Sequence, residues 1–178
     1  MLFADEKDPV TIIIFEIAGE NSIMIEVKYL HDCKKHIPAL ARLWYEEISR
    51  HWNSEASVEK AAEALHRHAQ IDKMPLAIVA LNQDKPIGMA CLRESDGIRP
   101  EMKPWLGSLV VDPQFRGKRL GENLINQIKA LAKSRGHEIL YLLAFDPTIP
   151  DWYAKLGWKH IGYDSYLGHR VTVMSITI

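Results

Sequence analysis

The sequence has 178 residues, of which 47% are hydrophobic and 25% charged, as expected of one globular domain with a sizeable core. The formal net charge of -1 argues against a broad nucleic-acid-binding surface. The two cysteines, Cys33 and Cys91, match no metal-binding or redox spacing, so we expect reduced structural thiols in a cytoplasmic protein.

The N-terminal part of the chain stands apart from the rest. An acidic start precedes an apolar run over residues 10–17. This run is too short to span a bilayer, and the acidic start does not fit a secretory signal, so we expect no membrane association. The run is interpreted as an edge strand, as a disordered lead-in, or as sequence upstream of a start at Met24. We treat residues 1–22 as an extension and residues 23–178 as the main domain.

The main domain is predicted to begin with one strand and two helices. Residues 23–30 alternate apolar and polar side chains, which is typical of a half-buried strand. Asp32 is predicted to cap a helix that continues to about residue 52. Either Ser54 or Ser57 then opens a second helix.

These two helices carry aromatic and histidine side chains. Trp44, Tyr45 and Trp52 could line a cleft for an acceptor, but their helical spacing favours core packing by about two to one. His66 and His68 are two positions apart and so face different directions on a helix. This spacing argues against a shared metal and predicts that both lie on the solvated surface.

The middle of the chain has the pattern of a hairpin followed by a central strand. Residues 75–82 and 87–93 form two apolar runs joined by a polar turn. A polar loop over residues 96–103 then leads to the run from Trp105 to Val111. Its apolar and β-branched residues predict a buried strand.

A glycine-containing basic turn follows this strand and precedes an amphipathic helix. It contains Arg116, Gly117, Lys118, Arg119 and Gly121. The first N–H groups of a helix lack intrahelical partners and lie at its positive end, so such a turn can hold a pyrophosphate. The spacing fits neither a Walker A loop nor a dinucleotide-binding turn. From the turn alone, an anion site and a basic surface turn that merely links a strand to a helix are about equally well supported, because isolated glycine motifs are weak evidence.

The C-terminal part is predicted to contain three strands and a short helix. Residues 139–144 form a buried apolar run. A short helix over residues 151–156 follows, with Gly157 as its left-handed C-terminal residue. Residues 158–162 and 170–178 are predicted as the last two strands.

Residues 111–121 resemble the acetyl-CoA signature of the GNAT superfamily of N-acetyltransferases. In that signature a strand is followed by proline, an aromatic residue and Arg/Gln-x-x-Gly-x-Gly/Ala. Arg116 lies at the Arg/Gln position and Gly121 at the final glycine. Arg119 occupies the position of the middle glycine, so its side chain is expected to point away from the pyrophosphate or toward another phosphate.

A second stretch, residues 151–158, resembles the Tyr-x-x-x-Gly-Phe/Trp motif of the same superfamily, and the resemblance covers residues 24–178. It implies a mixed α/β (α+β) fold. The expected sheet is mostly antiparallel, with about six to seven strands and about four flanking helices. Two parallel strands, residues 106–111 and 139–144, are expected to splay apart and hold acyl-CoA between them.

The resemblance also implies the residues that bind acetyl-CoA. The backbone of Leu109, Val110 and Val111 would pair with the pantetheine amides like an added strand. The pyrophosphate would lie on the turn formed by Arg116, Gly117, Lys118, Arg119, Leu120 and Gly121. No metal is implied.

Catalysis by the family mechanism needs an acid, an oxyanion donor and a base. Tyr153 matches the tyrosine that protonates the leaving thiolate, and the N–H of Leu109 is the simplest oxyanion donor. Glu101 is a weak candidate for the general base, with a water relay weighted equally. The other candidate carboxylates are Glu94, Asp96 and Asp146.

The function implied is transfer of an acetyl group from acetyl-CoA to a primary amine of a small molecule or a protein. The alternative is a non-catalytic acyl-CoA-binding sensor or interaction module with the same fold. Retention of Tyr153 favours the enzyme, and Arg119 slightly favours the sensor. The apolar last strand is compatible with a homodimer.

Overall fold

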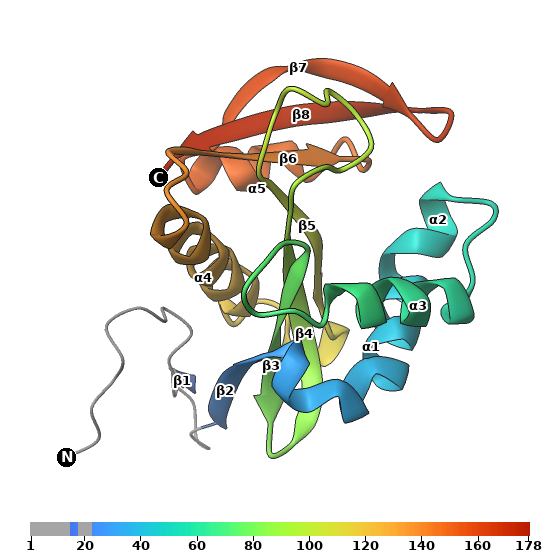
Figure 1. Ribbon diagram of the computed structural model, residues 1–178, viewed down its shortest axis with the longest axis vertical. Coiled ribbons are helices and arrows are strands. Elements are labelled where there is room, and N and C mark those ends of the chain that lie inside the picture. The colour runs from blue at the N-terminus through green and yellow to red at the C-terminus, as the bar shows by residue number, and fades with distance from the viewer. Residues whose placement is uncertain (1–14, 18–22) are drawn as a thin grey trace.

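The computed structural model describes residues 15–17 and 23–178 of the chain (Figure 1). In this part, eight strands form one sheet in the order β1-β2-β3-β4-β5-β6-β8-β7. Every neighbouring pair is antiparallel except β5 and β6, which are parallel. The predicted mixed, mostly antiparallel sheet with one parallel pair is therefore confirmed, and the short strand β1 adds to it at the edge.

The strands are β1 (Phe15–Ile17), β2 (Ile23–Tyr29), β3 (Leu76–Asn82), β4 (Lys85–Arg93), β5 (Trp105–Val111), β6 (Ile139–Ala144), β7 (Lys159–Tyr166) and β8 (His169–Thr177). The α-helices are α1 (Ile37–Trp44), α2 (Arg50–Trp52), α3 (Val58–His68), α4 (Leu120–Ser134) and α5 (Pro150–Lys155). Two short 3₁₀ helices, η1 (Leu30–His36) and η3 (Pro113–Phe115), and one π-helix, η2 (Tyr45–Ser49), complete the helical elements.

Helices cover both faces of the central strands (Figure 1). On β4, Ala90 and Leu92 pack in the core cluster that contains the apolar stripe of α4. Met89 and Cys91, which alternate with them, pack in the cluster that contains α1 and α3. Burial on both faces explains why β3 and β4 read as continuous apolar runs, and it fixes the register of the hairpin that leads to β5.

The first predicted helix is interrupted in the structure, and the predicted cap at Asp32 is wrong. Cys33 has non-helical backbone angles (φ -138°, ψ 40°), so η1 is kinked in its middle, and α1 begins after His36. The helix then widens into the π-turn η2, a feature that is frequent at functional sites. Ser57 is the correct choice for the second helix, because its hydroxyl accepts the Lys60 N–H at 3.2 Å.

The described part of the N-terminal apolar run, residues 15–17, forms an edge strand, in agreement with one of the three interpretations. Phe15–Ile17 pairs with β2, with Phe15 opposite Ile25. The remainder of residues 1–22 lies outside the described residues, and the alternative start at Met24 stays a hypothesis.

His68 is buried, so its predicted surface position is wrong, whereas His66 is exposed as predicted. Ala61, Leu65 and His68 follow one another at helical spacing on the inner face of α3. The His68 Nδ1 lies 3.4 Å from the buried Cys91 Sγ. Burial, aided by the positive charges of Arg93 and Arg67, lowers the pKa of His68 from 6.5 to about 3.

This buried histidine makes stability depend on pH. Between pH 6.5 and about 3 the unfolded chain binds a proton at His68 that the folded chain does not, so stability falls as pH falls. From about pH 7 to about pH 5 we expect a loss of about 2 kcal/mol in unfolding free energy from this residue. Urea titrations should show that His68→Leu removes this component, while His66→Leu on the exposed face leaves it. Equal pH dependence in wild type and His68→Leu would contradict the assignment.

Candidate active site

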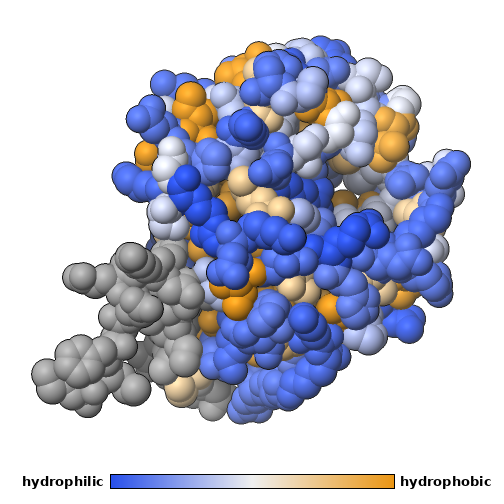
Figure 2. Space-filling model, in the orientation of Figure 1, coloured by the Kyte–Doolittle hydropathy of each residue, from blue (hydrophilic) through white to orange (hydrophobic). Residues whose placement is uncertain are grey.

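Strands β5 and β6 separate almost at once, as the family resemblance predicted. They share one register position, Trp105 opposite Tyr141, where the Tyr141 N–H donates to the Pro104 carbonyl at 3.1 Å. The rings of Trp105 and Tyr141 pack at 5.7 Å and close this end of the pair. Beyond it the strands border a cavity of about 550 Å³, to which both contribute residues. Figure 2 shows the molecule hollowed between its helical side, near α2, and the β7–β8 side.

A bulge in β5 shapes the wall of this cavity. The register of β4 and β5 shifts between Met89 and Cys91, and Ser108 adopts a positive φ of 47°. A non-glycine residue in this conformation is strained by about 1 kcal/mol. Among the described residues, neither Ser108 nor Leu109 has a register partner on β4 or β6. The backbone at Leu109 therefore lies along the cavity wall, where the sequence predicted the oxyanion donor.

A buried ion pair supports the bulge, and sequence reasoning did not identify it. Arg93 donates to the Asp96 carboxylate and to the Ser108 hydroxyl. Its guanidinium carbon lies 5.8 Å from the centre of the Trp44 ring. The guanidinium also lies against Gly107, where the Cβ of any larger residue would be only 2.7 Å from the Arg93 Cζ atom. Burial alone would lower the pKa of Arg93, but Asp96 raises it above its usual value, so the guanidinium stays charged.

The basic turn predicted from the sequence lies between η3 and α4. Gly117 and Arg119 have positive φ values of 73° and 61°. The first hydrogen bond within α4 runs from the Asn123 N–H to the Arg119 carbonyl. The N–H groups of residues 120–122 come before this bond, at the helix start, where N–H groups have no carbonyl partner within the helix. This helix start, with glycines on both sides of Lys118, has the features of an anion site.

The arginines of this turn are held by carboxylates. The Arg119 guanidinium bonds Glu122 at 2.9 and 2.7 Å. Arg116 donates from Nε to the Val111 carbonyl at 3.1 Å and from Nη2 to Glu47 at 2.6 Å. Glu47 belongs to η2 and lines the cavity, so this contact joins the turn to the opposite wall.

The Arg119–Glu122 pair leads to a prediction for acyl-CoA affinity. Glu122 places a negative charge in the first turn of α4, and it pairs with the Arg119 guanidinium, which could otherwise bind phosphate. We expect Glu122→Gln to tighten acetyl-CoA binding about two- to threefold at low ionic strength. Calorimetric titration against the exposed control Glu138→Gln measures the effect. Weaker binding by Glu122→Gln would show that Arg119 needs this partner.

Tyr153 lines the cavity from α5, opposite β5. Only 8% of the residue is exposed, and its ring packs against Trp152 and Trp158 at 4.9 and 5.8 Å. Burial raises the pKa of Tyr153 well above its usual value of 10, so the phenol keeps its proton. Gly157 has a φ of 92° just after α5, in agreement with the predicted left-handed C-terminal residue.

The candidate carboxylates lie in different places. Asp96 and Asp146 line the cavity, whereas Glu94 and Glu101 are exposed and are not among its lining residues. The Asp146 carboxylate accepts the Thr148 N–H at 2.8 Å, and this bond lowers the pKa of Asp146. The structure therefore does not bring Glu101 together with Tyr153.

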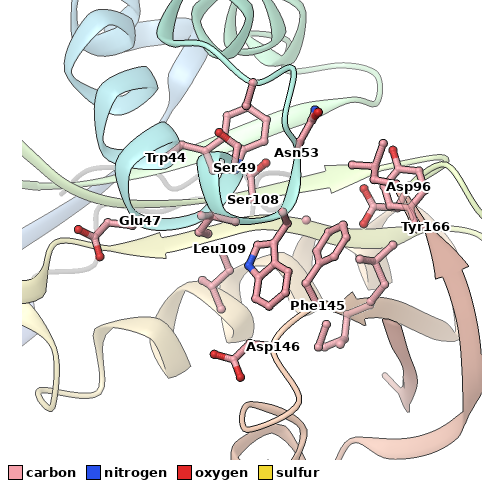
Figure 3. A pocket seen from close by; sticks show the side chains of 18 of the residues that line it. Trp44, Glu47, Ser49, Asn53, Asp96, Ser108, Leu109, Phe145, Asp146 and Tyr166 are labelled. Atoms are coloured by element: carbon pink, nitrogen blue, oxygen red, sulfur yellow. The ribbon is translucent and has the colours of Figure 1, made fainter. Parts of the chain in front are cut away.

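Three rings from distant elements form what we call the aromatic wall: Trp52, Phe145 and Tyr166. Trp52 and Phe145 stack with centroids 5.6 Å apart, and Phe145 and Tyr166 lie 5.8 Å apart. All three line the cavity, and so does Trp44, whereas Tyr45 does not. Figure 3 shows Phe145 and Asp146 on opposite sides of the chain after β6, with Tyr166 beside Asp96. Trp44 and Trp52 thus line the cavity, and Trp44 also packs against the core cluster of α1 and α3, as its spacing predicted. Binding of an acceptor there stays a prediction.

Over residues 15–17 and 23–178 there is no group of three or more His, Cys, Asp or Glu side chains that could hold a metal ion. None of the helices there combines the length and the apolar character needed to cross a membrane.

Comparison with known proteins gives a consistent result. The model of the acetyltransferase (GNAT) family matches residues 38–158. An aminoglycoside 6'-N-acetyltransferase complexed with coenzyme A has a TM-score of 0.66 and 19% identity, over 85% of this chain and 96% of that one. An acetyltransferase from Streptococcus agalactiae 2603 has a TM-score of 0.68 and 15% identity, over 86% and 98%. At these identities the structures indicate a shared fold. No curated protein matches the sequence.

Proposed function

The chain belongs to the acetyltransferase (GNAT) family, and we propose that it transfers the acetyl group of acetyl-CoA to a primary amine. It is an acyl-CoA-dependent acyltransferase. The observation that carries the proposal is the early separation of β5 and β6, which opens a cavity lined by both Leu109 and Tyr153.

The proposed placement of the cofactor uses the backbone of β5 and the turn before α4. The pantetheine arm would run beside the backbone of Leu109, Val110 and Val111, which β6 leaves without a register partner. The pyrophosphate would then meet the helix start and the turn Arg116–Gly121. To do so it would compete with Glu47 for Arg116, since the free protein pairs these two side chains.

In this arrangement the acyl group passes directly from the thioester to the amine, by addition and then elimination at the carbonyl carbon. The neutral amine nitrogen attacks the thioester carbon, and the carbonyl becomes an oxyanion within reach of the Leu109 N–H. When the intermediate collapses, the C–S bond breaks and the electron pair leaves on sulfur. The protonated hydroxyl of Tyr153 donates to this sulfur as the thiolate forms.

The amine must also lose a proton. The Asp96 carboxylate is already occupied by Arg93. The bond from Thr148 lowers the pKa of Asp146, which makes it a weak base. Glu101 lies on an exposed turn and could take the proton only through water. We propose a water relay through the cavity as the route. If Glu101 were instead the base, Glu101→Gln would lower the rate most at low pH.

Product analysis tests the proposed function. Acetyl-CoA is incubated with the protein and a panel of primary amines, and thiol release is followed together with the mass of each amine. We expect amine-dependent thiol release and one amide-linked acetyl group on the amine. Acetyl-CoA binding with no amine-dependent turnover would instead support the non-catalytic acyl-CoA sensor.

A further inference from the structure

The aromatic wall is a preformed surface at one end of the cavity. Trp52 comes from α2, Phe145 follows β6, and Tyr166 ends β7, so three distant parts of the chain meet there. The two ring contacts hold the rings in a nearly continuous stack, with interplanar angles of 17° and 33°. Each ring remains half-buried and lines the cavity.

Neighbouring groups hold the wall in place. His169 packs edge-on against Trp52 at 5.4 Å. At the other end, the Tyr166 ring lies so close to Gly97 that a Cβ there would be 2.6 Å from its Cε2 atom. A surface held in this way can bind an apolar group with little loss of side-chain freedom.

The charged groups beside the wall cancel one another. Asp96, which Figure 3 shows next to Tyr166, is paired with the buried Arg93. Only 16% of the Arg93 side chain and 11% of the Asp96 side chain are exposed. Glu47, at the far side of the cavity, is paired with Arg116. Asp146 also lines the cavity without an ion-pair partner among the described residues, but Figure 3 shows it on the opposite side of the chain from Phe145. The carboxylate beside the wall, that of Asp96, is thus already compensated and is not free for a second ammonium group.

From these observations we infer that the acceptor is a primary amine carrying one aromatic ring, which packs on the aromatic wall while the amine faces the thioester. The inference rests on the proposed function and names its substrate class. Offset and edge-on contacts between rings add to plain apolar burial, so the wall favours an aromatic body over a saturated one. A diamine would place its second ammonium group against the apolar rings, which is unfavourable, and Asp96 is already paired and does not offset this cost.

Matched amines test the inference. Phenethylamine, cyclohexylethylamine and cadaverine share a primary amine on a short chain, but only the first carries an aromatic ring. The kcat/KM of each is measured by thiol release, and binding of each to the CoA-loaded protein by calorimetry. We expect phenethylamine to exceed both others at least about tenfold in both measurements, a factor that corresponds to about 1.4 kcal/mol.

Variants connect this preference to the wall. Trp52→Leu and Tyr166→Leu should bring phenethylamine and cyclohexylethylamine to within about twofold of each other. Tyr166→Phe keeps the ring and should keep the preference. Tyr163→Leu makes the same change on β7 at an exposed ring that does not line this cavity, and should also keep it. Thermal unfolding of each variant checks that the fold is retained.

The outcomes separate the two proposals. Turnover of cadaverine or cyclohexylethylamine equal to that of phenethylamine overturns the substrate class and leaves amine acetylation standing. Preferred binding of phenethylamine without turnover overturns amine acetylation, and with it the assignment as a substrate, but supports the aromatic wall as a binding surface for aromatic amines. Absence of both binding and turnover for all three amines overturns both. A preference that survives in both leucine variants of the wall overturns the role of these rings.

Discussion

Tyr153→Phe is expected to lower kcat at least about a hundredfold, the lower end of what a positioned general acid contributes. The change removes one hydroxyl from a ring that packs between Trp152 and Trp158, so the fold and the cavity should persist. The acetyl-CoA dissociation constant should change less than about twofold, because the lost donor acts on the thiolate that forms only in the reaction.

Steady-state kinetics and calorimetry on the same preparation measure both quantities. Tyr141→Phe is the matched control, since Tyr141 lies on β6 and is not among the cavity-lining residues. Because burial raises the pKa of Tyr153, wild-type kcat should show no loss from its ionisation up to about pH 10. A Tyr153→Phe variant that retains most of its kcat would remove this residue from the role of acid.

Arg93→Leu is expected to lower the unfolding free energy by about 3 kcal/mol, because it leaves the Asp96 carboxylate buried without its cation. It also removes the donor that holds the Ser108 hydroxyl at the bulge of β5. The double variant Arg93→Leu/Asp96→Leu should recover most of this loss, since no unpaired charge then remains.

Urea unfolding of the single and double variants completes this cycle. The exposed pair Lys35–Asp84, with an N–O distance of 2.6 Å and side chains 65% and 64% exposed, is the control. Lys35→Met should cost less than about 1 kcal/mol, as is usual for a surface ion pair. If Arg93→Leu lowers the unfolding free energy no more than Lys35→Met does, the pair does not act as a buried unit. The same conclusion follows if the losses caused by the changes at Arg93 and Asp96 simply add in the double variant.

Local sequence patterns were sufficient for the elements that the cofactor would contact. The strand β5, the turn from Arg116 to Gly121 and the helix α4 are contiguous in the chain, so one motif describes their geometry. The short helix that carries Tyr153 is likewise a local pattern, closed by Gly157. Apolar runs also predicted the two strands β5 and β6, whereas their parallel pairing and early separation came only from the family resemblance.

The acceptor side could not be predicted in the same way, because its contacts join distant residues. Arg116 and Glu47 are 69 positions apart, and the rings of Trp52 and Phe145 meet only after the sheet has formed. Arg93 lies at the end of a predicted strand and carries no motif. The π-turn η2, which presents Glu47 to the cavity, interrupts a pattern that reads as regular helix. His68 could have been placed correctly, since its spacing from Leu65 and Ala61 is that of one buried face.

The central claim is that acetyl-CoA lies between β5 and β6 with its pyrophosphate on the turn before α4. Calorimetric titration with acetyl-CoA and with S-acetylpantetheine, which lacks the pyrophosphate, tests it most directly. We predict one binding site for acetyl-CoA, and binding at least about tenfold weaker for S-acetylpantetheine, because only acetyl-CoA reaches the helix start and the basic turn. No heat with acetyl-CoA, or equal affinity for the two compounds, would contradict this placement.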